Sequence, residues 1–121
     1  MEVLRVTGTE DTPAIMLDKE NGVFEISGRS LPEDATVFYK PVLQWLKLYV
    51  GSPNPVTDFA FKFEYFNTGS SKLILDILSE LEKVRNAQVS WYFNEDDEDM
   101  EEAGEDFSQL VKVPFDFKTY E

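Results

Sequence analysis

The first third of the chain holds short apolar-rich runs typical of β-strands, and the last of them, residues 23–27, alternates between apolar and polar positions. Residues 3–7, 14–18 and 23–27 form three such runs. An Asn-Gly pair at positions 21 and 22 separates the second run from the third, and this pair is typical of tight hairpin turns. The pattern therefore predicts a β-hairpin near the N-terminus.

The apolar period then changes from that of a strand to that of a helix. The apolar residues at helical spacing are Val37, Phe38, Val42, Trp45, Leu46 and Tyr49. Two residues compete as the N-cap: Ser30, which opens a Ser-Leu-Pro-Glu segment resembling a capping box, and Asp34. Pro41 lies inside the pattern, and we expect it to kink the first turns or to delay the regular helix until after Lys40.

Residues 57–66 (TDFAFKFEYF) are the clearest strand in the sequence. Strict alternation predicts two faces. One face carries Phe59, Phe61, Phe63 and Tyr65, and the other carries Asp58, Ala60, Lys62, Glu64 and Phe66.

The second half of the chain alternates between helical and strand patterns. Residues 73–84 predict a helix with a stripe made of Ile74, Ile77, Leu78 and Leu81. Residues 88–93 predict a strand, and a short helix follows with one face made of Met100, Ala103, Phe107 and Leu110. Residues 113–120 fit either a last strand or a docked tail. This order predicts an α/β fold, with α+β as the alternative: a mixed sheet of four to five strands with helices packed on it. We expect residues 1–121 to form a single domain.

Composition excludes several chemistries. The chain has 121 residues, no Cys and no His, which excludes Cys or His nucleophiles, Ser-His-Asp triads, ordinary zinc sites, haem ligation and disulfides. We expect no cofactor. A net charge of −13 repels nucleic acid and anionic lipid, so neither is an expected partner. The N-terminal residues lack a signal-peptide pattern and no apolar run could span a membrane, so we expect a cytoplasmic protein.

Most of the excess negative charge lies in residues 94–106, which hold nine acidic residues and no basic ones. An EF-hand is excluded because Glu102 stands where that calcium loop needs Gly and Ser108 stands where it needs Glu. Two interpretations of residues 95–106 remain: a solvated acidic helix start, which the helix dipole favours, and a docking surface for a basic partner.

A run of hydroxyl side chains marks the junction between the strand predicted for residues 57–66 and the helix that follows it, in the segment EYFNTGSSK. Thr68, Ser70 and Ser71 are each suited to the N-cap or the first helical turn. Helix N-termini also attract anions, so the junction could bind a phosphate or a nucleotide, or one hydroxyl could itself be phosphorylated with Lys72 nearby. A P-loop is excluded because the GxxxxGK[S/T] spacing is absent.

Two weaker candidates remain. Glu64, Asp76 and Asp106 could supply the paired carboxylates of a hydrolase, although nothing in the sequence pairs them. Arg29 could be an anion ligand or a solvated turn residue.

The segments TGTEDTPAI, GRSLPED, FYKPVLQWL, EYFNTGSSK with LILDIL, and GEDF with a later PF resemble the SiaC family of regulatory phosphoproteins over nearly the whole chain. The specific part is the acceptor motif Tyr/Leu-Phe/Leu-Asn-Thr-x-Ser-x-Lys. The family is similar in design to STAS-domain anti-sigma antagonists, which are small α/β proteins switched by phosphorylation of one hydroxyl at a helix N-terminus. The resemblance therefore implies a STAS-like fold.

The resemblance also implies a function without catalysis. Thr68 would be the phosphoacceptor, with Ser70 and Ser71 as secondary candidates, and Asn67, Thr68, Gly69, Ser70 and Lys72 would contact the partner. The implied partners are a dedicated protein kinase, an opposing metal-dependent protein phosphatase, and a target that binds the unphosphorylated form. In the best-known member that target is a diguanylate cyclase, whose cyclic di-GMP promotes biofilm formation. Gly69 stands where many members have Ser.

Overall fold

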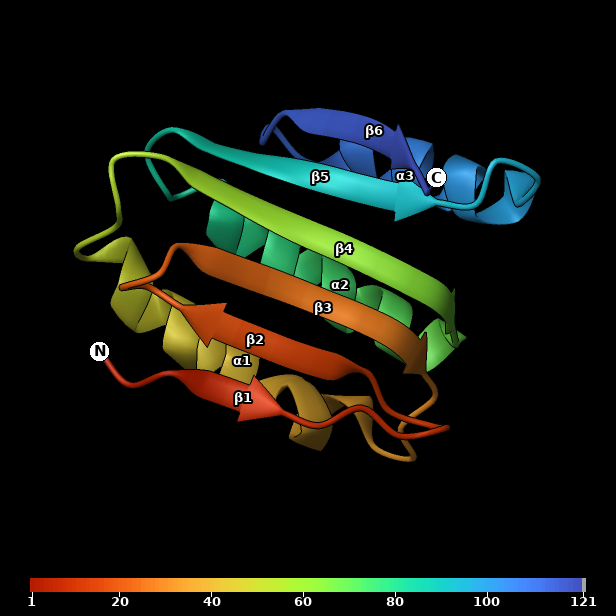
Figure 1. Ribbon diagram of the computed structural model, residues 1–121, viewed down its shortest axis with the longest axis horizontal. Coiled ribbons are helices and arrows are strands. Elements are labelled where there is room, and N and C mark those ends of the chain that lie inside the picture. Colours follow the sequence, from red (N-terminus) through yellow and green to blue (C-terminus); the bar gives the residue numbers. More distant parts are fainter. Residues whose placement is uncertain (121) are drawn as a thin grey trace.

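A computed structural model describes residues 1–120 as one six-stranded sheet and three helices (Figure 1). The elements in chain order are β1 (Leu4–Val6), β2 (Ala14–Asp18), β3 (Val23–Ser30), α1 (Ala35–Val50), β4 (Thr57–Phe66), α2 (Thr68–Leu81), β5 (Ala87–Phe93), α3 (Glu98–Leu110) and β6 (Phe115–Thr119). The α/β class is confirmed. Six strands replace the expected four to five, because β1 joins the sheet and residues 115–119 form a strand rather than a docked tail.

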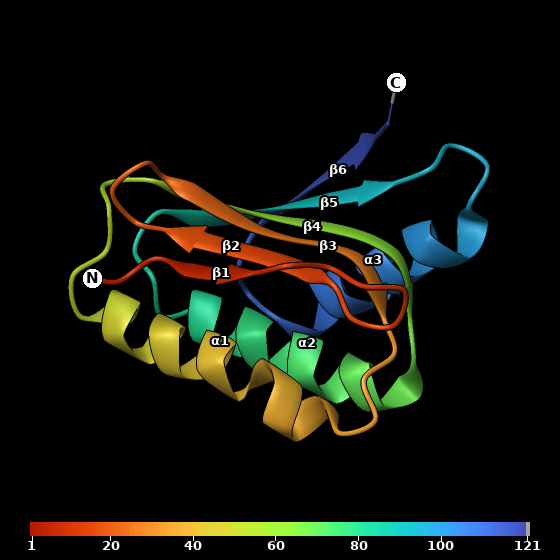
Figure 2. The same cartoon turned by 60° about the horizontal axis from the view of Figure 1, so that its bottom comes forward.

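The strands lie in the sheet in the same order as in the chain. β1, β2 and β3 are antiparallel, and β3, β4, β5 and β6 are parallel. Each parallel pair is joined through a helix, and such crossovers are almost always right-handed. Since the crossovers all step in one direction across the sheet, their helices fall on one face, as Figure 2 shows. The other face carries no helix in the part of the chain that the structure describes.

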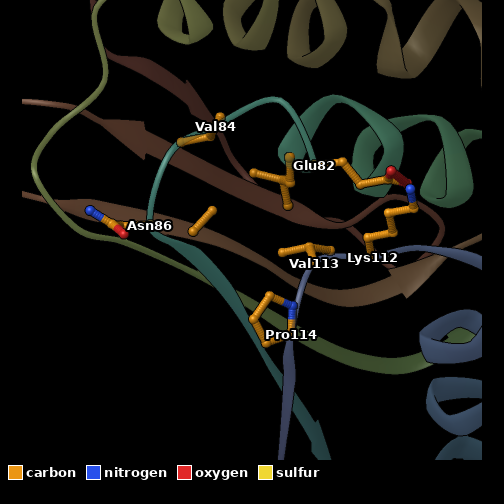
Figure 3. A pocket seen from close by; sticks show the side chains of 8 residues that line it. Glu82, Val84, Asn86, Lys112, Val113 and Pro114 are labelled. Atoms are coloured by element: carbon orange, nitrogen blue, oxygen red, sulfur yellow. The ribbon is translucent and has the colours of Figure 1, made fainter.

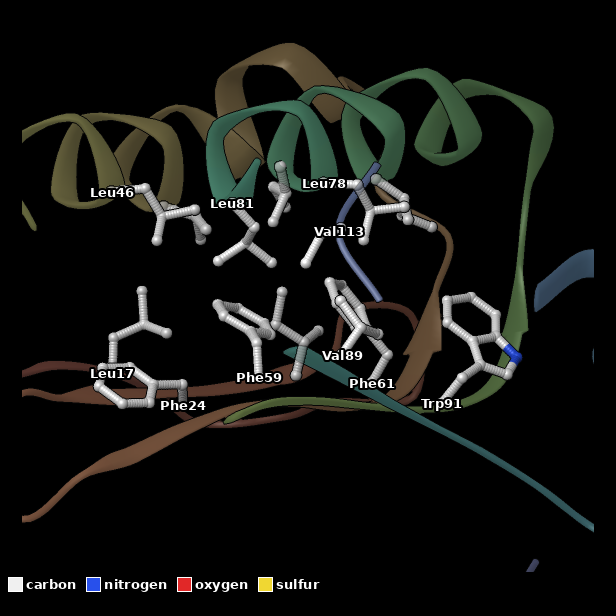
Figure 4. Close-up of a cluster of buried hydrophobic side chains, with 14 of the residues drawn as sticks. Leu17, Phe24, Leu46, Phe59, Phe61, Leu78, Leu81, Val89, Trp91 and Val113 are labelled. Carbon is white, nitrogen blue, oxygen red and sulfur yellow. The ribbon is translucent and has the colours of Figure 1, made fainter. Parts of the chain in front are cut away.

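The core lies between that helical layer and the sheet (Figure 4). Phe59 and Phe61 of β4 point from the sheet toward Leu78 and Leu81 of α2, and all four side chains are fully buried. The predicted α2 stripe is confirmed, because Ile74 and Ile77 are also fully buried. No helix within residues 1–120 is both long and apolar enough to cross a membrane.

The predicted faces of β4 are wrong at the end of the strand. The pairing of β3 with β4 shifts after Gly28, so that Gly28 pairs with Phe63 while Arg29 pairs with Tyr65. This irregularity reverses the alternation beyond Glu64. Tyr65 is consequently half exposed, and Phe66 turns toward the core, where its ring lies 5.6 Å from that of Phe63.

The expectations for α1 also need correction. Asp34 caps the helix by accepting a hydrogen bond from the Val37 amide, and Ser30 is instead the last residue of β3. The helix starts at Ala35 and contains Pro41, so its start is not delayed past Lys40. Val37, predicted to face the core, is exposed.

The acidic segment continues directly into α3. Asp97 caps the helix through the Met100 amide, and Glu98, Asp99 and Glu101 occupy its first turn, where negative charge favours the helix dipole. The prediction of an acidic helix start is therefore confirmed. On the predicted apolar face, Met100 and Phe107 are buried, whereas Leu110 is 66% exposed.

Candidate functional site

The junction between β4 and α2 is held in place by Asn67, which was not among the residues expected to cap the helix. Its amide donates to the Ser30 carbonyl at 3.0 Å and so ties the turn to the end of β3. Its side-chain Oδ1 accepts from the Ser70 amide at 2.9 Å. Asn67 is thus the N-cap, and Thr68, Ser70 and Ser71 are first-turn residues.

Ser70 points inward and is fully buried. Its Oγ lies 2.7 Å from Asn67 Oδ1 and 2.8 Å from Ser30 Oγ, and Ser30 Oγ lies 2.5 Å from the Tyr39 hydroxyl. Each hydroxyl has one proton, so a consistent assignment donates from Tyr39 to Ser30, from Ser30 to Ser70, and from Ser70 to Asn67. We call these four residues the buried network.

The buried network contains two residues that the sequence did not assign to this junction. Tyr39 is fully buried on α1, and burial raises the pKa of its hydroxyl to about 12. A neutral Tyr39 keeps the proton that it donates. Ser30 lies 40 positions before Ser70, so no local pattern could have paired them.

Thr68 is the hydroxyl of the junction that faces solvent. It is the first residue of α2, and within residues 1–120 its side chain makes no hydrogen bond. The amides of Thr68 and Gly69 have no backbone acceptor in the same region, as expected for the first turn of a helix. The junction therefore presents an unengaged hydroxyl beside the positive end of a helix dipole.

The remaining predicted partner-binding residues surround Thr68. Gly69 and Lys72 are exposed and Asn67 is partly buried, whereas the Ser70 side chain is fully buried and is not available to a partner. Ser71, a secondary phosphorylation candidate, is partly buried. A Cβ at Gly69 would meet no atom closer than 3.8 Å, so the space around it would accept Ser. Arg29 lies in β3 rather than in a turn, and its guanidinium carbon is 5.9 Å from the centre of the exposed Tyr65 ring.

A cavity of about 220 Å³ lies beside the junction, between the first turn of α2 and α3. Its lining residues are Phe66, Ser71, Ala103, Asp106, Phe107 and Leu110. The four α3 residues follow the spacing of one helical stripe. Ser71 lies about one helical turn after Thr68, so the cavity and the exposed hydroxyl belong to one surface. We call this cavity the α2–α3 groove.

The carboxylates considered for hydrolysis are not brought together. Glu64 lines a cavity on the helix-free face of the sheet, Asp106 lines the α2–α3 groove, and Asp76 lines neither. Among the described residues, no three acidic side chains are grouped so that they could hold a metal ion.

Another cavity, of about 280 Å³, lies beyond the C-terminal end of α2 and has Glu82 and Lys112 as its charged lining residues (Figure 3).

The family model of the SiaC family regulatory phosphoproteins matches residues 6–120 of this chain. The chain belongs to the SiaC family. Two solved SiaC structures from Pseudomonas aeruginosa agree with this assignment. Apo-SiaC is 28% identical, with a TM-score of 0.87 over 98% of this chain and 99% of that one. A crystal structure of the diguanylate cyclase SiaD in complex with its activator SiaC contains a chain that is 27% identical, with a TM-score of 0.89 over 97% of this chain and 99% of that one.

A further relative extends the SiaC similarity at the level of sequence. An uncharacterised protein of Pseudomonas aeruginosa strain UCBPP-PA14 is 27% identical over 100% of this chain and 99% of its own length. The resemblance seen in the sequence is thereby confirmed. This SiaC family member is a regulatory phosphoprotein of signal transduction, built on the mixed sheet described above.

Proposed function

We propose that this protein is a non-catalytic partner switch controlled by phosphorylation of Thr68. In the unphosphorylated form, the β4–α2 junction and the α2–α3 groove bind and regulate a target protein, which we propose to be a diguanylate cyclase. A protein kinase adds the phosphoryl group to Thr68, and a metal-dependent protein phosphatase removes it. We propose that these events take place in the cytoplasm.

The observation that carries this proposal is the opposite placement of two neighbouring hydroxyls. Thr68 is exposed and makes no hydrogen bond within residues 1–120, whereas Ser70 is fully buried in a network that holds the turn. A kinase can reach the first hydroxyl without unfolding the helix, but it cannot reach the second. Burial therefore argues against Ser70 as a secondary acceptor, and Ser71, at the wall of the groove, stays a candidate.

The surroundings of Thr68 explain how a phosphoryl group would act as a switch. It adds about −1.5 to −2 charge at a place where a partner must exclude water. A partner that supplies no Arg or Lys there would have to desolvate a dianion, which costs several kcal/mol. Lys72, about one helical turn after Thr68, and the positive end of the helix dipole offset only part of this charge, and the nearby groove already holds the carboxylate of Asp106. A loss of about 4 kcal/mol would weaken binding about a thousandfold.

The site of phosphorylation can be tested in protein purified from its native cells. Cleavage after Lys62 and Lys72 releases residues 63–72, which contain Thr68, Ser70 and Ser71. We expect mass spectrometry to place a phosphoryl group on Thr68. The Thr68→Ala variant should bind the target constitutively and should keep binding it after kinase treatment, while Thr68→Asp should bind weakly. An alanine variant that still loses the target on kinase treatment would move the acceptor to Ser71.

The same preparation separates the switch from a small-anion or nucleotide-binding module. Such a module should gain thermal stability when inorganic phosphate or a nucleotide binds to the helix N-terminus. The partner switch should show no such gain, and its interaction with the target should depend on the state of Thr68.

A further inference from the structure

β6 forms one outer edge of the sheet, and its hydrogen-bonding groups alternate in direction. The Val89 amide of β5 donates to the Pro114 carbonyl at 2.8 Å, and Val89 pairs with Phe115 in the parallel register. In a parallel ladder, this places the amides and carbonyls of residues 116 and 118 toward β5. The amides and carbonyls of Phe115, Phe117 and Thr119 therefore point away from the sheet.

The outer edge of β6 is self-complementary. An antiparallel pairing of two copies centred on Phe117 places Phe117 opposite its own symmetry mate and Phe115 opposite Thr119. These three residues are the ones whose backbone groups point outward. The pairing would therefore use every outward amide and carbonyl of the strand, with no group left unpaired at the new interface.

The same register also matches the side chains. Asp116 of one copy comes to lie opposite Lys118 of the other, and the two-fold axis repeats this pair. Both residues are available, because the Asp116 side chain is 60% exposed and Lys118 is 38% exposed. Within one chain Lys118 and Asp116 form a long ion pair of 3.9 Å, and Lys118 Nζ is 5.8 Å from the Tyr92 ring centre. Exposed pairs of this kind contribute little stability, so the pairing across the two-fold axis can replace it. Phe117 is 38% exposed, and pairing would cover it against its mate.

We propose that the outer edge of β6 pairs antiparallel with β6 of a second copy of this chain, in the register centred on Phe117, to form one continuous sheet. A two-fold axis perpendicular to the sheet keeps the three helices of both copies on the same face. The opposite edge is less suited to pairing, because β1 has only three residues. The net charge of −13 on each copy opposes association, so this dimer forms best at moderate or high ionic strength.

Sedimentation velocity on the full chain tests the proposal, over about a hundredfold range of protein concentration at physiological salt. We expect a concentration-dependent shift from monomer to dimer. Asp116→Lys and Lys118→Asp should each weaken dimerisation about tenfold, because each places two like charges face to face at both symmetric pairs. The double variant Asp116→Lys/Lys118→Asp restores the opposite charges and leaves the net charge unchanged, so it should dimerise like the wild type. Lys47→Asp, which changes the exposed face of α1, controls for net charge alone.

Amide hydrogen exchange supplies a second readout that follows the alternation of β6. Raising the protein concentration should slow exchange at Phe117 and Thr119 and leave Lys118, whose amide faces β5, unchanged. A wild type that stays monomeric throughout, or a double variant as weak as the single variants, would overturn the proposal. Equal weakening by Lys47→Asp and Lys118→Asp would also overturn it, since it would show that only net charge matters.

Discussion

The buried network makes Ser70→Ala the most informative stability variant of the junction. The substitution removes a hydroxyl that lies within 2.8 Å of both Asn67 Oδ1 and Ser30 Oγ. In the variant, Asn67 still caps the amide of residue 70, and Ser30 still contacts Tyr39. The buried Ser30 hydroxyl, which donates to Ser70 in the assignment above, loses its acceptor. Such a loss costs about 1–3 kcal/mol. For a chain of this length that corresponds to about 4–12 °C in the melting temperature.

Urea unfolding, followed by tryptophan fluorescence, measures the free energy of unfolding for each variant. Thr68→Ala should change it by at most about 0.5 kcal/mol, because the Thr68 side chain is exposed and unbonded. Ser79→Ala, at an exposed position of the same helix, is the matched control. The reasoning fails if Ser70→Ala is as stable as the wild type, or if Thr68→Ala loses as much stability as Ser70→Ala does.

Three further outcomes follow from the packing of α3, the ionisation of Tyr39 and the space around Gly69. A Cβ at Gly104 would lie 2.5 Å from the Trp91 ring, so Gly104→Ala should lower the free energy of unfolding by about 1–3 kcal/mol in the same urea assay, and an unchanged value would refute this contact. The raised pKa of Tyr39 means that its contribution is complete below pH 10, its unfolded value, and is lost as the pH rises toward about 12. The stability advantage of the wild type over Tyr39→Phe should therefore shrink above pH 10 in pH-dependent unfolding, and a constant difference would contradict the assignment. Gly69→Ser should keep both the fold and the kinase reaction at Thr68, as measured by thermal melting and phosphopeptide analysis, because the added side chain meets no close atom.

Patterns within one element were enough to predict the helix α2 and the β2–β3 hairpin. The stripe from Ile74 to Leu81 follows the helical period, and the Asn-Gly pair places Gly22 at φ +67°, in the left-handed region that this turn needs. The strand-to-helix junction was also visible, because a strand period and a helical period meet there. The sequence thus located the strand-to-helix junction to within a few residues.

The roles of individual residues within the site depended on contacts that no local pattern records. Ser70 and Thr68 look equivalent as first-turn hydroxyls, and only Ser30 and Tyr39, from β3 and α1, show that Ser70 is structural. The alternation of β4 likewise predicted that Tyr65 shares the face of the buried Phe residues, but the irregular pairing at Gly28 reverses the alternation at this end of the strand. Tertiary contacts override local pattern at these positions.

The central claim is that the charge on Thr68 decides whether the target binds. The direct test is a calorimetric titration of the diguanylate cyclase captured from the native cell with unphosphorylated protein, with protein phosphorylated at Thr68, and with the Thr68→Ala variant. We expect the unphosphorylated protein and the Thr68→Ala variant to bind with similar affinity, and the protein phosphorylated at Thr68 to bind about a thousandfold more weakly. Equal affinities for all three forms would contradict it.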